Sequence, residues 1–188
     1  MERVARWAGL EDGGLEHLSL RVESERVVAD AIVIGDASAP FGLSYRLTCD
    51  GDWRVREVQA TLVGADRAIS LRSDGHGRWS DAAGQPVPML DACIDVDIAA
   101  TPFTNTLPIR RLGLRPGESR DIRAAYLAVP SLELAAVSQR YTRLDASTYR
   151  YEGFPPGFSA DITVDADGLV VEYPGLFRRV VRPPGKPA

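Results

Sequence analysis

The sequence predicts an all-β fold, an antiparallel rolled sheet or open barrel-like roll, and two patterns carry that prediction. Apolar and polar residues alternate with period two over many short segments, as expected for strands that bury one face. Turn-forming pairs such as Asp-Gly and Pro-Gly separate these segments at spacings of about ten residues. Short strands divided by regular turns are typical of antiparallel sandwiches, rolls and barrels.

The expected strands follow one another along most of the chain. In chain order, alternation predicts strands over 18–22, 26–34, 43–47, 53–63, 68–72, 121–129, 142–153, 158–165 and 169–173. Turn pairs stand at 50–51, 74–75, 116–117, 167–168 and 174–175. Evidence for helix is limited to 121–128 and 132–139, which are apolar enough for a turn or two and are separated by Pro130.

The composition favours one β-roll domain over residues 1–181, followed by a flexible C-terminal tail over 182–188. A chain of 188 residues can build a full hydrophobic core, and its Pro-rich end is typical of a disordered terminus. Apolar residues at 45% and charged residues at 26% exclude wholesale disorder. The net charge of −4 argues against nucleic acid or an anionic membrane as partner, because such binders carry a basic excess.

Neither a membrane span nor a resident cofactor is expected. No apolar stretch approaches the roughly 18 residues that cross a bilayer, and the first residues lack the basic-then-apolar pattern of a secretory signal, so we expect a cytoplasmic protein. His17 and His76 have no His or Cys partner at ligand spacing, which predicts no metal site. Cys49 and Cys93 are expected to be free thiols. Phosphate-binding loops and nucleophile elbows are absent from the sequence.

A weak internal repeat relates two parts of the chain. Residues 41–55 and 158–170 both begin with Phe, alternate, and reach an Asp-x-Asp pair; the first aspartates, Asp50 and Asp165, stand 115 positions apart. Two explanations stay open. The chain contains a duplicated strand-turn-strand module, or antiparallel hairpins have converged on one pattern.

The densest chemistry lies between Leu90 and Arg111. If 90–98 is a strand, Asp95 and Asp97 share one face with Asp91 and Cys93. Carboxylates along one face repel one another unless they are hydrated or opposed by cations. Arg110 and Arg111 could supply that opposition, and the alternative is a solvated outer face.

The next segment, 101–108, is a rigid polar stretch between two prolines. It contains Thr104 and Asn105, the only asparagine of the chain. Such a segment suits sugar hydroxyls or its own backbone equally well. The aromatic residues, at 7%, are not enriched, and most are expected in the core with one or two lining a pocket.

Two adjoining segments resemble the signature of a bacterial family first catalogued as of unknown function and labelled "putative glycolipid-binding". They are residues 91–97 and the run Thr-Pro-Phe-Thr-Asn-Thr-Leu-Pro-Ile-Arg-Arg that ends at Arg111. Trp7, the 139–142 run and the closing 165–173 run resemble that signature too. The resemblance covers nearly the whole chain. It implies a many-stranded rolled sheet, similar in shape to half-barrels that carry lipoproteins or lipids in the bacterial envelope, although this chain shows no export signal.

We therefore expect a non-catalytic protein that binds a glycolipid or similar amphiphile, with an apolar concavity for acyl chains and a polar rim for the headgroup. Gln139 and Tyr141 share one strand face and join the rim. The apolar wall or its mouth is assigned to Tyr45 and Trp53. The candidate rim residues are Asp95, Asp97, Thr104, Asn105, Arg110, Gln139 and Tyr141.

Two other functions stay open. A hydrolase that acts on a sugar or acyl ligand is favoured if two carboxylates converge in a cleft and one has a raised pKa. A protein-interaction domain is favoured if side chains fill the concavity and an apolar patch lies outside it. The sequence names no catalytic residue and leaves the oligomeric state open.

Overall fold

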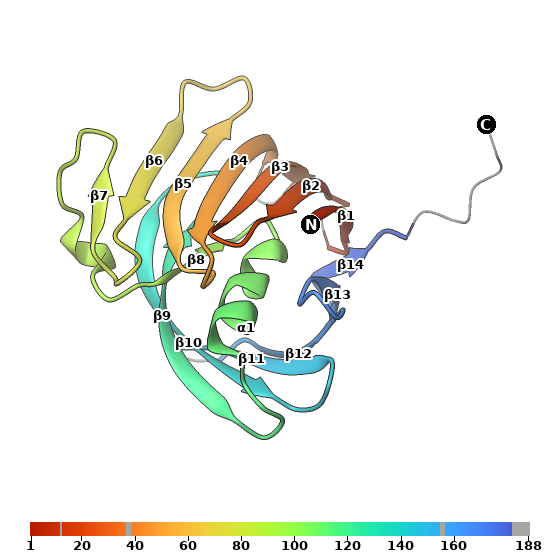
Figure 1. Ribbon diagram of the computed structural model, residues 1–188. Helices are drawn as coiled ribbons and strands as arrows, with labels where there is room; N and C mark the ends of the chain where they lie inside the picture. Colours follow the sequence, from red (N-terminus) through yellow and green to blue (C-terminus); the bar gives the residue numbers. More distant parts are fainter. Residues whose placement is uncertain (12, 37–38, 155–156, 182–188) are drawn as a thin grey trace.

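The computed structural model describes residues 1–11, 13–36, 39–154 and 157–181. The strands within these residues form one fourteen-stranded sheet that curls into a roll without closing, since β7 and β8 end the strand order (Figure 1). Every neighbouring pair is antiparallel except β8 and β9, which run parallel. The predicted all-β rolled sheet is confirmed. The tail over 182–188 lies outside the described residues.

The sheet consists of two runs of strands that follow chain order. The first run is β1 (Glu2–Gly9), β2 (Leu15–Val22), β3 (Arg26–Asp36), β4 (Pro40–Asp50), β5 (Val55–Leu62), β6 (Ala68–Ser73) and β7 (Trp79–Asp81). The second run is β8 (Asp95–Ile98), β9 (Ser119–Leu127), β10 (Leu134–Arg143), β11 (Thr148–Phe154), β12 (Ser159–Val164), β13 (Val170–Tyr173) and β14 (Phe177–Arg179).

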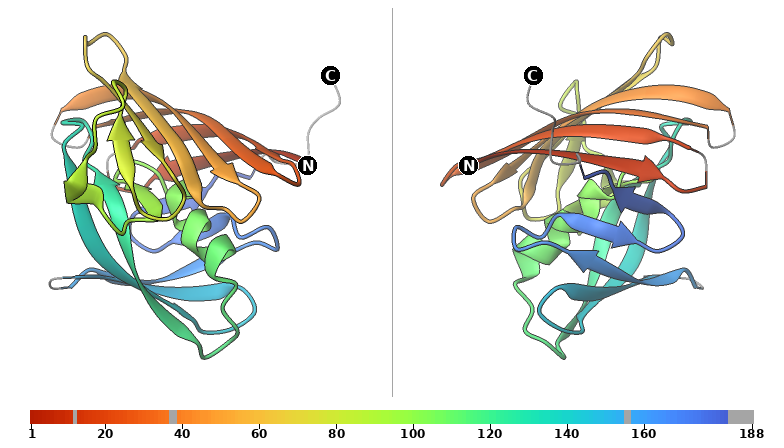
Figure 2. Two further views of the ribbon diagram at one scale, coloured as in Figure 1. Left: turned by 60° about the vertical axis from the view of Figure 1, so that its left-hand side comes forward. Right: turned by 90° about the vertical axis from the view of Figure 1, so that its right-hand side faces the viewer.

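The first and the last strand of the chain lie next to each other in the middle of the sheet. The chain runs from β1 out to the β7 edge, crosses through the short 3-10 helix η1 (Pro88–Leu90) to β8 at the other edge, and returns strand by strand to β14. β14 then pairs with β1, so that Trp7 lies opposite Arg179. Figure 2 shows these two strands side by side where the two halves of the sheet meet.

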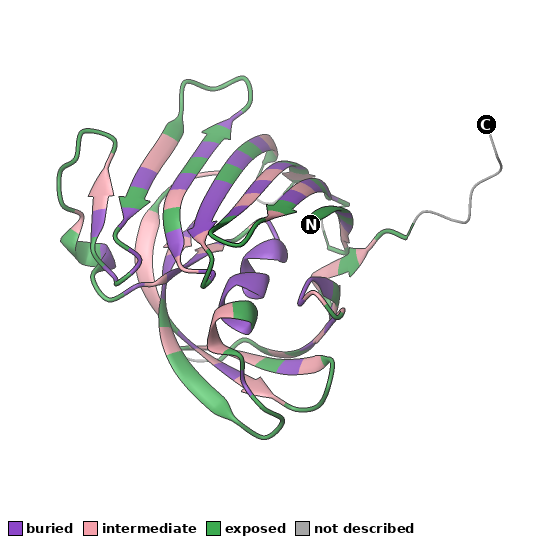
Figure 3. Ribbon diagram, viewed as in Figure 1, coloured by how far each residue is buried: buried purple, intermediate pink, exposed green. Residues whose placement is uncertain are grey.

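Alternating burial explains why β2 to β5 form strands. Figure 3 shows them banded in buried and exposed residues. Residues such as Leu18, Leu43 and Val58 are fully buried on the inner face, and burying each aliphatic side chain of this kind contributes roughly 1.5–3 kcal/mol. The buried apolar side chains form two clusters. The larger one is built mainly from the first half of the sheet and also includes Ile98 of β8 and Leu127 of β9. The smaller one lies in the second half.

A helical segment crosses the concave side of the roll between these clusters. It consists of η2 (Phe103–Asn105) and α1 (Thr106–Leu112), which ends at Gly113 with a φ of 55°. Leu107 packs in one cluster and Ile109 in the other. Pro108 fits because it stands in the first turn, where its missing N–H has no helical partner to lose. The polar stretch over 101–108 is therefore largely helical rather than an extended loop, and the centre of the concavity holds a helix (Figures 1 and 2).

Other local predictions need correction. The proposed strand over 90–98 begins only at Asp95, because Leu90 ends η1 and Ala92 has a φ of 68°. Segment 132–139, given as a candidate helix, belongs largely to β10, and 121–128 is the strand β9 that alternation predicted. Trp53 precedes β5 in a turn with a φ of 65°. The alternative of a solvated carboxylate face does not hold for Asp95, which is buried, whereas Asp91 is exposed.

The two turns of the internal repeat have the same hydrogen bonds. Asp50 Oδ1 accepts from the N–H groups two and four residues ahead at 3.1 and 3.0 Å, and Asp165 Oδ1 does the same at 3.0 Å each. Asp74 and Asp81 repeat the arrangement outside the 115-residue offset. Aspartate turn chemistry therefore explains this likeness without a duplication.

No helix among the described residues is long and apolar enough to span a membrane.

Candidate functional site

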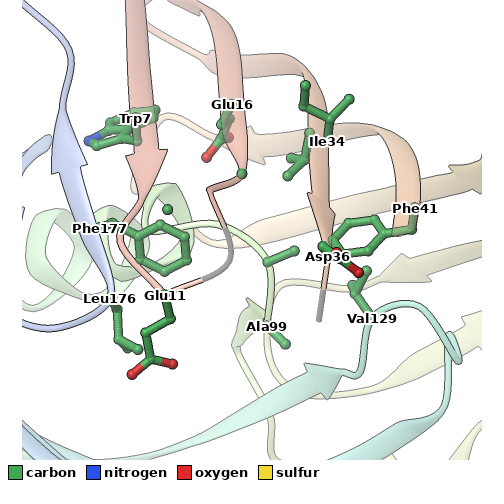
Figure 4. A pocket seen from close by; sticks show the side chains of 14 residues that line it. Trp7, Glu11, Glu16, Ile34, Asp36, Phe41, Ala99, Val129, Leu176 and Phe177 are labelled. Carbon is green, nitrogen blue, oxygen red and sulfur yellow. The ribbon is translucent and has the colours of Figure 1, made fainter. Parts of the chain in front are cut away.

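An apolar cavity of about 320 Å³ opens at one end of the roll, beside the β1–β2, β3–β4 and β13–β14 connections (Figure 4). That volume falls at the lower end of the range for small-molecule sites, about 300–1,000 Å³. The side chains that form most of its wall are apolar, and they come from both halves of the sheet and from the segments after β8 and β9: Trp7, Val33, Phe41, Ala99, Val129 and Phe177.

The polar groups of this cavity are acidic. Glu16 points from β2 into the space bounded by Phe41 and Phe177 (Figure 4). Glu11 and Asp36 line it as well. Within the described part of the chain, no lysine, arginine or histidine lines the cavity.

Glu16 is held on the inner face by the register of the sheet. It pairs with Trp7 on β1 and with Val33 on β3, so three lining residues stand side by side. Its side chain also has the inward position shared by Leu18 and Leu20, two and four residues later, and only 2% of it is exposed.

Among the described residues, the Glu16 carboxyl has hydroxyl partners and no cation. Tyr45 donates its O–H to Oε1 at 2.5 Å, and Thr101 donates to Oε2 at 2.6 Å. Thr101 is fixed in turn by the N–H of Phe103, which donates to its Oγ1 at 3.0 Å. Burial raises the pKa of Glu16 to about 7, although the hydrogen bonds from Thr101 and Tyr45 act in the opposite direction.

Asp95 is the most buried of the predicted rim carboxylates and is neutralised within the fold. Arg111 donates two hydrogen bonds to it, from Nε to Oδ1 at 3.0 Å and from Nη2 to Oδ2 at 2.5 Å. The sequence suggested Arg110 and Arg111 as counter-charges, and the structure assigns this contact to Arg111. Desolvation raises the pKa of Asp95, and the Arg111 hydrogen bonds and charge oppose the shift.

Five of the other predicted residues meet near η2. Gln139 donates to Asp97 Oδ2 at 2.6 Å, and Thr104 approaches Oδ1 at 3.5 Å. Tyr141 donates to Asn105 Oδ1 at 2.9 Å. Burial raises the pKa of Asp97, while the Gln139 and Thr104 hydrogen bonds lower it. These groups therefore satisfy one another inside the roll.

Arg110 and Trp53 form a separate pair. The Arg110 guanidinium lies 5.2 Å from the centre of the Trp53 ring, and both line a polar hollow that also includes His76. The turn at Gly168 packs against the Arg110 stem, where an added Cβ would lie 3.0 Å from Cδ.

None of the predicted rim and wall residues lines the apolar cavity. Tyr45 comes nearest, since its hydroxyl bonds to Glu16. Glu16 itself was missed, although alternation could have found it: extending the apolar set Leu18, Leu20 back by two residues places an acid on the buried face.

A row of aromatic rings joins the cavity to the polar groups near η2. Phe177 lines the cavity and lies 6.3 Å from Tyr173. Tyr173 lies 6.2 Å from Tyr151, which lies 5.5 Å from Tyr141. These edge-to-face contacts are favourable for ring pairs. The predicted Gln139–Tyr141 face is thus connected to the cavity wall through packed rings of the core.

The outer face near the cavity carries exposed apolar side chains. Leu15 lies opposite Ile34 in the β2–β3 register, and Ile32 is two residues away on the same face. Ile34 also lines the cavity. This is the kind of outer patch by which a protein-interaction domain would be recognised.

Comparisons with known proteins connect this arrangement to one family. The model of a family described as "Putative glycolipid-binding" matches residues 4–179. The crystal structure of a DUF1089 family protein from Pseudomonas aeruginosa is 43% identical in sequence, with a TM-score of 0.79, and the match covers 89% of this chain and 92% of that one. No curated protein matches the chain.

Proposed function

The chain belongs to the family described as "Putative glycolipid-binding", and from that premise we propose that it binds an amphiphile, without catalysis, by taking an alkyl or acyl chain into the cavity bounded by Trp7, Phe41 and Phe177. The observation that carries the proposal is the cavity itself, an apolar space with a few polar groups. That division is the usual anatomy of a small-molecule site.

The position of α1 refines where the ligand lies. Because η2 and α1 fill the centre of the roll with Phe103 and Leu107, both fully buried, a chain enters from the end of the roll rather than along its axis. A volume of about 320 Å³ suits one chain or a short ligand better than a lipid with several chains.

The predicted rim takes part for a ligand that extends past Phe177. Such a ligand follows the row of rings and meets Tyr151 before Gln139 and Tyr141. In this proposal Asp97 and Thr104 hold Gln139, and Asn105 holds Tyr141. Asp95, which is bound by Arg111, and the exposed Arg110 act on the fold and do not contact the ligand. Short single-chain amphiphiles do not need them.

Native mass spectrometry of the purified protein, followed by lipid extraction, tests the proposal. We expect a co-purified amphiphile, or stabilisation by added ones in a thermal-shift screen; a ligand at 100 times its Kd stabilises the fold by about 2.7 kcal/mol. No bound lipid together with no stabilisation by any amphiphile would refute it.

A cavity-filling variant ties binding to this site. Ala99 lines the cavity and is exposed, so Ala99→Trp should block it while leaving the core intact. Ala83→Trp places the same side chain in an exposed turn away from the cavity. Binding should be lost in the first variant and retained in the second; equal binding in both would place the ligand elsewhere.

A second candidate function is favoured by one observation. Glu16 has a pKa raised to about 7 and shares its cavity with Glu11 and Asp36, which is the arrangement expected of a hydrolase with an acid and a second carboxylate. Release of p-nitrophenol from octyl-chain esters and from glycosides tests it. Turnover that Glu16→Gln abolishes would support catalysis, and no turnover with either substrate class would leave binding alone.

A further inference from the structure

We infer that the cavity selects amphiphiles whose polar end donates hydrogen bonds and carries no negative charge, and that it rejects anionic amphiphiles such as fatty acids. This rests on the proposed function and adds the chemical class of the ligand. The charge and the hydrogen-bonding capacity of the cavity wall carry the inference.

The charge of the wall has one sign. Glu11, Glu16 and Asp36 line the cavity, and the described lining residues include no cation. Glu16 is the buried acid of the three, and Glu11 and Asp36 are exposed. Because a charge beside an apolar space is weakly screened, a negative headgroup next to Glu16 is repelled by the ionised carboxylate. A neutral hydroxyl-bearing headgroup meets no such repulsion, and an ammonium group is attracted.

The hydrogen-bonding capacity of Glu16 points the same way. Each of its oxygens accepts one bond within the protein, from Tyr45 and from Thr101. A carboxylate offers about four acceptor sites, so both oxygens can accept a further hydrogen bond from the cavity side. A sugar O–H or an ammonium N–H can donate it, whereas a carboxylate or phosphate diester cannot.

The arginines that could recognise an anion are placed elsewhere. Arg111 is held by the buried Asp95, and Arg110 lies over the Trp53 ring beside a different hollow. Arg179 donates Nη1 to Asp165 at 2.5 Å, and its Nε and Nη2 are buried without a partner among the described residues. It lies behind the Trp7 ring and does not line the cavity. Specificity against anions is therefore built from repulsion as well as from attraction to donors.

Three probes with the same eight-carbon chain test the inference: octyl glucoside, octylammonium and octanoate, each below its micelle concentration. Calorimetric titration at pH 8, where Glu16 is ionised given its pKa of about 7, gives their Kd values. We expect octanoate to bind at least about tenfold more weakly than the better of the other two. Tighter binding of the glucoside identifies a hydroxyl headgroup, and tighter binding of octylammonium identifies an amine.

Glu16→Gln removes the innermost charge. It should weaken octylammonium binding about tenfold, whereas Asp121→Asn, which removes an exposed charge on β9, should leave all three affinities unchanged. Thermal melting confirms that both variants fold.

The outcomes separate the inference from the proposed function. Octanoate that binds as tightly as octyl glucoside and octylammonium overturns the inference while the proposed function stands. If none of the three probes binds, the cavity is not an amphiphile site, and the proposed function fails together with the inference.

Discussion

Two buried acids in this molecule, Glu16 and Asp95, have opposite surroundings. Only 2% of Glu16 and 1% of Asp95 is exposed. Arg111 contacts both oxygens of Asp95, whereas Glu16 has, within the part of the chain that the structure describes, two hydroxyl partners and no cation, and a cavity lies beside it. A buried carboxylate with a bidentate arginine is a closed structural unit. A buried carboxyl bonded only by hydroxyls at the wall of an empty space is free to meet a ligand.

The comparison predicts its largest effect at Arg111. Arg111→Ala leaves Asp95 buried without its counter-charge, and loss of one partner of a buried ion pair costs about 3–5 kcal/mol. We expect urea denaturation to show a destabilisation of that size. An Asp95→Leu/Arg111→Met double variant removes both charges and should recover much of the loss. A cost below about 1 kcal/mol for Arg111→Ala would show that the pair is solvated.

Glu16 should give the fold a distinctive pH dependence. The pKa of Glu16 is about 7 in the folded protein, against an ordinary value of 4.5 that applies to the unfolded chain. Below pH 4.5 the carboxyl is protonated in both states, and its full contribution to stability is present. Between pH 4.5 and 7 the unfolded chain loses the proton and the folded protein keeps it, so the free energy of unfolding falls by about 3 kcal/mol. Denaturation from pH 4 to 8 should show this decline in the native protein relative to Glu16→Gln. Parallel profiles for the two proteins would contradict it.

A smaller effect is expected where the polar groups near η2 satisfy one another. Tyr141→Phe deletes the donor to Asn105 Oδ1 and leaves a buried acceptor without it, at a cost of about 1–3 kcal/mol. Denaturation measures this cost, and octyl glucoside affinity should not change, because Tyr141 does not line the cavity. A changed affinity with unchanged stability would move the ligand site to this group.

The smallest effect is expected at Arg110. Its guanidinium is exposed and lies over Trp53, so Arg110→Ala should cost about 0.5–1 kcal/mol. Comparing its denaturation midpoint with that of Arg111→Ala separates two neighbouring arginines that the sequence presents as equivalent. A larger cost for Arg110→Ala than for Arg111→Ala would reverse their assigned roles.

The sequence predicted strands best where one face of the strand is buried and the other is exposed to solvent. β2 to β5 alternate over many residues, and the alternation follows directly from the pleat. β14 and β7 have only three residues each, which is too short to recognise an alternation of apolar and polar residues. Helix α1 was missed because four of its seven residues, Thr106 to Ile109, are buried in succession, so no apolar stripe marks a single face.

The candidate site was harder to predict for a topological reason. The rim carboxylates were recognised from sequence, but whether they faced solvent depended on α1, which places Arg111 against Asp95. The cavity is lined by Trp7, Phe41, Ala99 and Phe177, which become neighbours only when β14 returns to β1. No local sequence pattern predicts that these residues become neighbours.

A crystal structure of the protein with octyl glucoside would show whether an alkyl chain occupies the end of the roll. We expect continuous density for the chain between Phe41 and Phe177, with a glucose hydroxyl within hydrogen-bond distance of an acidic lining residue. An empty cavity, with the glucoside bound on the outer face near Ile32 or in the hollow beside Trp53, would contradict it.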